Sequence, residues 1–362
     1  MVGSFFVIPT KIILVSYPDY FRLKESKSLV DAAFVGSSYK IVKLITNKYL
    51  GNSKFGLSSG KSMEIKEYAK EYYADQIIID ERLNSKQIYN LEKLTGIQIK
   101  DRERLILDIF YSRASTVEAK LQIQLAEIQY ELPRTRENAK ITSLSERPGK
   151  GGQGEYIVDV KFRDLKRRIG FIKTKLEYAK QQRELYQHQR LKNDIPVISL
   201  IGYTSSGKTT LFNRLTNDNK KTSPTLFTTL STTTRSFQIN YKKILITDTI
   251  GFISRLPTYM IDAFKSTLEE SLAADMILLM LDSSENMEDI KIKYYSCRDI
   301  LNELKVEKSK VFIIFSKFDK FNFLRSEQIL HDLGIPYALS ISSKSGYGLH
   351  KLKTLIADYL KI

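Results

Sequence analysis

The feature that most constrains this chain is an eight-residue loop, Gly202-Tyr203-Thr204-Ser205-Ser206-Gly207-Lys208-Thr209, which fits the pattern G-x-x-x-x-G-K-[ST]. The loop follows the apolar run Val197–Ile201 and opens the helical run Thr210–Leu215, which is the strand, loop and helix context that the pattern requires. Its glycines let the backbone wrap closely, so amide groups and the helix N-terminus face a phosphate chain. We expect Lys208 to reach the β- and γ-phosphates and the Thr209 hydroxyl to bind Mg²⁺.

A second motif, Asp248-Thr249-Ile250-Gly251, follows the apolar run Ile244–Thr247 and fits D-x-x-G. An aspartate that ends a strand beside a P-loop holds Mg²⁺, usually through a water, and the glycine amide contacts the γ-phosphate. Between the two motifs, the stretch from Leu226 to Arg235 carries Thr228, Thr229, Thr232, Thr233 and Thr234. A switch loop needs one threonine to close on Mg²⁺ and the γ-phosphate, but spacing alone does not select it.

A third motif predicts which base is bound. Ser316-Lys317-Phe318-Asp319 ends the apolar run Val311–Phe315. A carboxylate at Asp319 accepts hydrogen bonds from the ring N–H and the exocyclic amine of guanine, which adenine does not offer, so ATP is rejected. Lys317 is expected over the base. The usual motif is Asn-Lys-x-Asp, and the serine at position 316 could lower affinity. Ser342-Ser343-Lys344 fits the loop whose backbone N–H contacts the guanine oxygen.

The residue after D-x-x-G is Phe252, where many GTPases place a glutamine that orients the attacking water. A phenyl ring cannot accept the hydrogen bond of that water. We therefore predict slow intrinsic hydrolysis, with polar help from a switch residue or a partner, worth roughly 10³–10⁵ in rate. Phe252 is alternatively a hydrophobic latch that packs away from the nucleotide, and both interpretations can hold together.

Residues 11–112 and 195–362 both alternate apolar runs with amphipathic stretches, which predicts α/β sheets. In the first region the helices expected are Lys61–Tyr72 and Ser85–Leu94, the second ending at Gly96. The strands expected there are Lys11–Val15, Ala32–Val35, Ile41–Ile45, Gln76–Ile79 and Ile97–Ile99. The strands expected in the second are Val197–Ile201, Phe237–Ile239, Ile244–Thr247, Met276–Asp282, Val311–Phe315 and Tyr337–Ile341. The second pattern is doubly wound, with the ligand at the carboxyl ends of the strands.

Residues 113–192 show a different pattern of apolar residues from the two regions on either side. Apolar residues recur at helical spacing along two seams: Leu121, Leu125, Ile128 and Leu132, then Leu165, Ile169, Ile172, Leu176 and Ala179. Between the seams, Pro133 to Glu155 includes a glycine run, so we expect two antiparallel helices joined by a long loop. From Lys161 to Lys192 there are 11 Lys or Arg against 3 Asp or Glu, in a chain whose net charge is +16. Such an excess indicates either a solvated helix face or a surface that meets RNA phosphates.

Composition narrows the class of protein further. The single cysteine, Cys297, cannot pair within the chain, which favours a reducing, cytoplasmic compartment, and three histidines make a histidine metal site unlikely. No stretch approaches the roughly 18 apolar residues of a membrane span. The start, Met1 to Thr10, lacks a basic leader and a small-residue cleavage site and is expected to be a disordered start or a first strand. We expect a monomer. The net charge of +16 indicates either a polyanionic partner, which is nucleic acid or an anionic membrane, or only a proteome-wide lysine bias.

The combined motifs resemble the HflX family of ribosome-associated GTPases. The resemblance rests on these segments: Gly202–Thr209 with Leu211-Phe212-Asn213, Leu226–Leu230 with Thr233-Thr234-Arg235, Asp248–Ile253 with Leu256-Pro257 and Ala263–Glu270, Asp101-Arg102 with Leu105–Phe110, Arg113-Ala114, Lys120-Leu121-Gln122, Leu132-Pro133-Arg134, and Gly154-Glu155. The resemblance covers residues 10–362. The sequence patterns described above predict three parts: an N-terminal α/β subdomain (1–112), a helical, coiled-coil hairpin with a Gly-rich loop (113–193) and a GTPase domain with a doubly wound sheet (194–362). The glycine loop Gly149–Glu155 is shorter than the family's.

The resemblance implies that Thr229 is the switch threonine bound to Mg²⁺. It also implies binding to the large ribosomal subunit and its rRNA, and a role in splitting or rescuing ribosomes. Catalytic roles are expected for Lys208, Thr229 and Gly251, and metal binding for Thr209, Thr229 and Asp248. The residues expected to contact GTP or GDP are Gly202, Tyr203, Thr204, Ser205, Ser206, Gly207, Lys208, Thr209, Thr210, Phe227, Thr228, Thr229, Leu230, Ser231, Asp248, Thr249, Ile250, Gly251, Ser316, Lys317, Asp319, Ser342, Ser343 and Lys344.

Two other functions compete with a ribosome-regulated GTPase. One is a passive rRNA-binding adaptor whose nucleotide site is largely structural, which Ser316 and Phe252 favour mildly. The other is an ATPase activity in the N-terminal part. The stretch Ser58-Ser59-Gly60-Lys61-Ser62 superficially resembles the end of a P-loop, but no glycine stands five residues before Gly60, so it is better interpreted as a loop.

Overall fold

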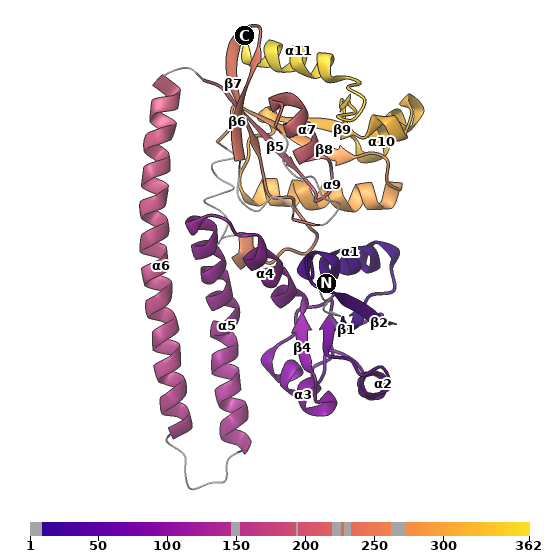
Figure 1. Ribbon diagram of the computed structural model, residues 1–362, viewed down its shortest axis with the longest axis vertical. Coiled ribbons are helices and arrows are strands. Elements are labelled where there is room, and N and C mark those ends of the chain that lie inside the picture. Colours follow the sequence, from indigo (N-terminus) through magenta and orange to yellow (C-terminus); the bar gives the residue numbers. More distant parts are fainter. Residues whose placement is uncertain (1–8, 146–152, 193–194, 219–225, 228–232, 262–272) are drawn as a thin grey trace, which may run out of the picture. The chain divides into compact units, whose positions relative to one another are not determined.

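A computed structural model describes residues 9–145, 153–192, 195–218, 226–227, 233–261 and 273–362. The chain divides into two compact units. The first comprises Met1–Ser112 and Leu121–Lys175, and the second comprises Arg113–Lys120 and Leu176–Ile362. Each unit is built around its own sheet (Figure 1).

The sheet of the first unit has four parallel strands in the order β2-β1-β3-β4. Its elements in chain order are β1 Thr10–Ser16, α1 Tyr20–Ala33, β2 Tyr39–Thr46, α2 Ser59–Glu71, β3 Gln76–Ile79, α3 Ser85–Thr95, β4 Gln98–Asp101 and α4 Arg102–Arg113. The α/β sheet predicted for this region is thus present, and all its strands are parallel. Helix α3 ends as predicted, at Gly96 in the left-handed conformation (φ 74°).

The strand predicted at Ala32–Val35 is wrong, because Ala32 and Ala33 belong to helix α1. This helix begins after Asp19, whose carboxylate accepts a hydrogen bond from the Arg22 amide at 2.9 Å and so caps the first turn. Its buried positions, Phe21, Glu25, Ser26, Leu29, Val30 and Ala32, follow helical spacing. Because polar residues interrupt this buried face, it does not show as an apolar periodicity in the sequence.

Two long helices follow, α5 (Val117–Ser145) and α6 (Gln153–Lys192), and Figure 1 shows them running in opposite directions. The long loop predicted from Pro133 to Glu155 is wrong, because α5 continues through Pro133 and α6 begins at Gln153. Within the predicted seams, four residues are almost fully buried: Leu125, Ile128, Leu165 and Ile172. Pro148, Gly149 and the rest of 146–152 lie outside the described residues.

A buried carboxylate explains how α5 tolerates a proline, which costs a helix interior about 3 kcal/mol. Asp101, at the end of β4, accepts hydrogen bonds from the Tyr130 hydroxyl at 3.0 Å and from the Arg134 guanidinium at 2.8 Å. These residues flank Pro133 on α5, and Arg134 also donates to the carbonyl of Leu83 at 2.7 Å. Because tertiary contacts hold both sides of the proline, the helix continues past it.

The second unit has a six-stranded sheet in the order β10-β9-β8-β5-β7-β6, parallel except for the antiparallel edge strand β6. Its strands are β5 Val197–Gly202, β6 Thr233–Ile239, β7 Lys242–Asp248, β8 Met276–Asp282, β9 Val311–Ser316 and β10 Leu339–Ser340. Its helices are α7 Lys208–Thr216, α9 Met287–Glu303, α10 Phe323–Leu333 and α11 Leu349–Leu360, with short 3₁₀ turns at Lys308–Lys310 and Phe318–Lys320. The predicted strands are all present, with β10 shorter than expected.

Apolar side chains cover both faces of this sheet. Alternate residues of β5 and β8, such as Ile198, Leu200 and Leu278, pack with α7 and α11 in one core. Their neighbours along each strand point to the opposite face, and α9 contacts β8. The arrangement is a doubly wound α/β sheet. None of the helices in the described part of the chain is apolar over a stretch that could cross a membrane.

Candidate nucleotide-binding site

Four parallel strands of the second unit end at one edge of the sheet, each with a residue of interest. They are β5 at Gly202, β7 at Asp248, β8 at Asp282 and β9 at Ser316. Because open α/β sheets bind ligands at the carboxyl ends of their strands, this edge is where a nucleotide site is expected. The first, second and fourth of these residues were predicted from the sequence, and Asp282 was not.

The loop after β5 has a backbone that only glycine fits at two positions. A Cβ at Gly202 would lie 2.4 Å from the carbonyl oxygen of Met280 on β8. Gly207 has a φ of 92° and directly precedes α7, which begins at Lys208. The loop therefore delivers the helix N-terminus, with its unpaired amides, to the carboxyl edge of the sheet. Ser205 and Thr210 are exposed at this edge.

Lys208 lies inside the loop rather than in solvent. Its side chain is 6% exposed, and its ammonium donates hydrogen bonds to the carbonyl oxygens of Gly202 at 3.0 Å and Tyr203 at 2.8 Å. Burial lowers the pKa of Lys208 to about 8, although the Asp248 carboxylate partly opposes the shift. The buried cation is held by neutral carbonyls, so a phosphate oxygen would gain a strong partner there.

The structure brings together the two described residues predicted to bind a metal. The Thr209 hydroxyl donates to Asp248 Oδ2 at 3.0 Å. A hydroxyl and a carboxylate are oxygen ligands of the kind Mg²⁺ prefers, with phosphate oxygens and waters completing its octahedron. Across the described ranges, no group of three or more His, Cys, Asp and Glu side chains is placed to hold a metal. The donor set fits a magnesium ion bound jointly with a nucleotide.

The segment after Asp248 is joined to the loop by its backbone. The Thr204 amide donates to the Phe252 carbonyl at 2.8 Å, and the Phe252 amide donates to the Gly202 carbonyl at 3.1 Å. A Cβ at Gly251 would lie 2.8 Å from the Thr204 Cα. The Phe252 side chain is 3% exposed, in agreement with the latch interpretation. The Thr249 hydroxyl donates to the carbonyl of Leu200 at 2.7 Å and therefore points into the sheet.

The predicted switch loop is described only at its start. Phe227 has a φ of 57° and is 2% exposed, so its ring packs inside the protein. Thr228, Thr229, Leu230 and Ser231 lie outside the described residues, and so does the family segment Ala263–Glu270. The roles of Thr229 as metal ligand and catalytic residue stay predictions.

The residues expected to select guanine meet at the ends of β9 and β10. The Ser342 hydroxyl donates to Asp319 Oδ1 at 2.6 Å, and this hydrogen bond lowers the pKa of the Asp319 carboxyl. Asp319 is exposed and ionised, and it is oriented by a serine that is fully buried. Ser343 is half-buried and Lys344 is exposed. The Phe318 ring stacks on Tyr347 with centroids 4.4 Å apart, which ties the two loops together.

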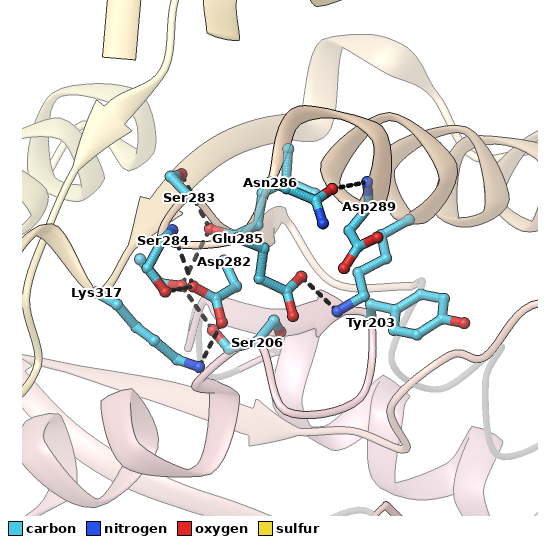
Figure 2. A network of polar contacts seen from close by, with 12 residues as sticks. Tyr203, Ser206, Asp282, Ser283, Ser284, Glu285, Asn286, Asp289 and Lys317 are labelled. Carbon is cyan, nitrogen blue, oxygen red and sulfur yellow. Dashed lines mark hydrogen bonds and ion pairs between the residues drawn. The ribbon is translucent and has the colours of Figure 1, made fainter. Parts of the chain in front are cut away.

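Lys317 has a partner that sequence analysis missed. Its ammonium forms an ion pair with Asp282, the last residue of β8, as Figure 2 shows. The other Asp282 oxygen accepts hydrogen bonds from the Ser284 amide at 3.1 Å and hydroxyl at 2.6 Å. Lys317 adopts a left-handed backbone conformation (φ 60°). The sequence signal for Asp282 was an acidic residue at the end of a predicted strand, and that strand, β8, pairs with the P-loop strand β5.

Comparison with known proteins decides the family. Profiles of protein families match three consecutive stretches: "GTP-binding GTPase N-terminal" over residues 21–111, "GTP-binding GTPase Middle Region" over 113–190 and "50S ribosome-binding GTPase" over 197–317. GTPase HflX of Methanocaldococcus jannaschii is 40% identical over 326 residues, which cover 90% of this chain and 80% of that protein. GTPase HflX of Hyperthermus butylicus is 32% identical over 97% of this chain and 96% of its own length. The chain belongs to the HflX family of GTPases.

Solved structures agree with this assignment. A GTP-binding protein from the hyperthermophilic archaeon Sulfolobus solfataricus in complex with GDP is 26% identical, with a TM-score of 0.50 over 97% of this chain and 99% of that one. The SsGBP and GDP complex is 27% identical, with a TM-score of 0.54 over 98% and 99% of the two chains. This HflX-family protein therefore binds guanine nucleotide and hydrolyses GTP.

Proposed function

We propose that this HflX-family GTPase is a Mg²⁺-dependent switch that associates with the large ribosomal subunit in the cytoplasm and contacts its rRNA. The observation that carries the proposal is the basic surface of α6. Seven Lys or Arg side chains lie between residues 161 and 175, and all are exposed: Lys161, Arg163, Lys166, Arg167, Arg168, Lys173 and Lys175. A helix that carries this many exposed cations is suited to contact phosphates.

The nucleotide residues keep the roles expected for them in this proposal. Lys208 and the loop amides hold the β- and γ-phosphates, while Thr209 and Asp248 hold Mg²⁺, which neutralises charge that develops on the phosphates. Asp319 reads guanine. With Phe252 buried against the P-loop, no side chain at that position orients water, so intrinsic hydrolysis is slow and the ribosome accelerates it. GTP binding then drives splitting or rescue of ribosomes.

Cosedimentation of the full chain with purified large subunits tests the association. We expect Lys166→Glu combined with Lys173→Glu to weaken binding at least tenfold, because each phosphate contact contributes to a salt-dependent affinity. Lys351→Glu combined with Lys353→Glu is the matched control, since these two lysines are also exposed and lie on α11. Equal loss in both double variants, or none in the first, would contradict the proposed surface.

A passive rRNA-binding adaptor remains the second candidate, favoured by the buried Phe252. GTP turnover with and without large subunits separates the two functions. The switch predicts stimulation by subunits that Lys208→Ala abolishes. The adaptor predicts subunit binding with no stimulation, and fast turnover by the isolated protein would refute the role assigned to Phe252.

A further inference from the structure

The serine at position 316 stands where the usual guanine motif has asparagine, and the structure gives it a specific task. Its side chain is 2% exposed, and its hydroxyl lies 2.8 Å from the carbonyl oxygen of Ser206 in the P-loop. The carbonyl oxygen of Leu281 on β8 is a second acceptor, at 3.0 Å. Position 316 therefore connects the strand that reads the base to the loop that binds phosphate.

The direction of one carbonyl fixes the direction of the next amide. The described chain contains no cis peptide, so the C=O of Ser206 and the N–H of Gly207 point to opposite sides of their shared plane. Ser316 holds the Ser206 carbonyl on the sheet side. The Gly207 amide then faces the inside of the loop, where amide groups bind phosphate oxygens.

We infer that Ser316 is a positioning residue for phosphate rather than a reader of the base: its hydroxyl orients the peptide between Ser206 and Gly207 for the β-phosphate. Base selection stays with Asp319, whose carboxylate is oriented independently by Ser342. One hydroxyl hydrogen serves two carbonyls, whereas a carboxamide has two hydrogens. The single hydroxyl hydrogen of Ser316 is thus shared between the P-loop and β8.

The test compares GDP and GMP, which differ only in the β-phosphate, by displacement of a fluorescent GDP derivative. Removing a partner from a buried carbonyl costs about tenfold in an equilibrium constant, so Ser316→Ala is expected to weaken GDP binding about tenfold and GMP binding less than about twofold. The preference for GDP over inosine diphosphate, which lacks the exocyclic amine, stays unchanged. Thermal melting of the ligand-free protein records any effect on folding separately.

Ser199→Ala is the matched control. Ser199 is a fully buried serine on β5 whose hydroxyl has no hydrogen-bond partner within the described residues, and its removal is expected to leave GDP affinity unchanged. Should Ser316→Ala not fold, Ser316→Thr and Ser316→Val provide a pair of equal shape that differs only in the hydroxyl, and only the valine is expected to lose GDP affinity relative to GMP.

The role of Ser316 is overturned if Ser316→Ala binds GDP as the unchanged protein does, if GDP and GMP weaken equally, or if the preference over inosine diphosphate disappears. The inference rests on the proposed placement of the nucleotide. Failure of that placement is recognised separately, because Lys208→Ala and Asp319→Asn would then leave GDP binding by the full chain unaffected.

Discussion

Proton uptake on nucleotide binding follows from the burial of Lys208. The ammonium is buried in the loop, where it donates hydrogen bonds to two carbonyls, and burial lowers its pKa from the ordinary 10.5 to about 8. That difference amounts to about 3 kcal/mol against the charged form. A bound phosphate chain stabilises the same charge, so binding raises the pKa of Lys208.

The size of the effect can be worked out from these values. At pH 8 about half of the ligand-free molecules carry a neutral Lys208, so GDP binding takes up roughly half a proton. Between pH 7 and pH 9 the ligand-free protein loses most of this proton, and GDP affinity falls about tenfold. GDP affinity falls as the pH rises because the bound state holds more protons than the free state. By the same linkage, the unfolded chain binds more protons than the ligand-free fold between pH 8 and pH 10.5, so stability rises over that range.

Isothermal titration of GDP at pH 8 in buffers of different ionisation enthalpy measures the uptake directly. The phosphates of GDP do not contribute, because a terminal phosphate with a pKa near 6 is ionised at pH 8. Cys297→Ala is the control, since burial raises the pKa of the nearby Cys297 thiol to about 12 and it stays protonated. Zero uptake at pH 8 in the unchanged protein, or uptake abolished by the control, would refute the reasoning.

Three further outcomes are expected. Asp319→Asn places a donor against guanine donors and lowers GDP affinity about a hundredfold, measured by the same displacement assay; unchanged affinity would contradict guanine recognition there. Thr209→Ala removes a proposed Mg²⁺ ligand, so GTP hydrolysis in Mg²⁺ falls at least tenfold while GDP binding in a chelator persists. Arg102→Ala breaks the ion pairs that Arg102 forms with the buried carboxylates of Glu25 and Asp80, which destabilises the fold by about 3–5 kcal/mol in urea unfolding; a smaller loss would mean that water replaces the guanidinium.

The positions of the candidate site residues on the second sheet could be predicted from the sequence, and so could the strands that carry them. Gly202, Lys208, Asp248 and Asp319 could be placed from the sequence because each motif follows an apolar strand, and parallel strands bring their carboxyl ends together. The two partners of an ion pair between strands have no fixed spacing in the sequence, so no motif predicts them. Lys317 and its partner Asp282 lie 35 positions apart, and no sequence motif links them.

Local propensity failed where tertiary contacts prevailed. The apolar end of α1 resembles a strand when its polar buried positions are ignored, and Pro133 resembles a helix end when the hydrogen bonds of Tyr130 and Arg134 are unknown. The helix is stabilised in one case by polar residues at buried positions, and in the other by hydrogen bonds between residues that are distant in sequence. Neither kind produces a periodic apolar signal.

Asp101 gives helix α5 a mechanical property. The fully buried Asp101 carboxylate holds the helix beside Pro133 at the end of β4. Two further hydrogen bonds involve Leu83: its amide donates to Asp101, and its carbonyl accepts from Arg134. The helix is held at Pro133, which is the position where it would otherwise bend. Force applied along α5 is therefore transmitted to the four-stranded sheet as a whole rather than absorbed by a kink at the proline.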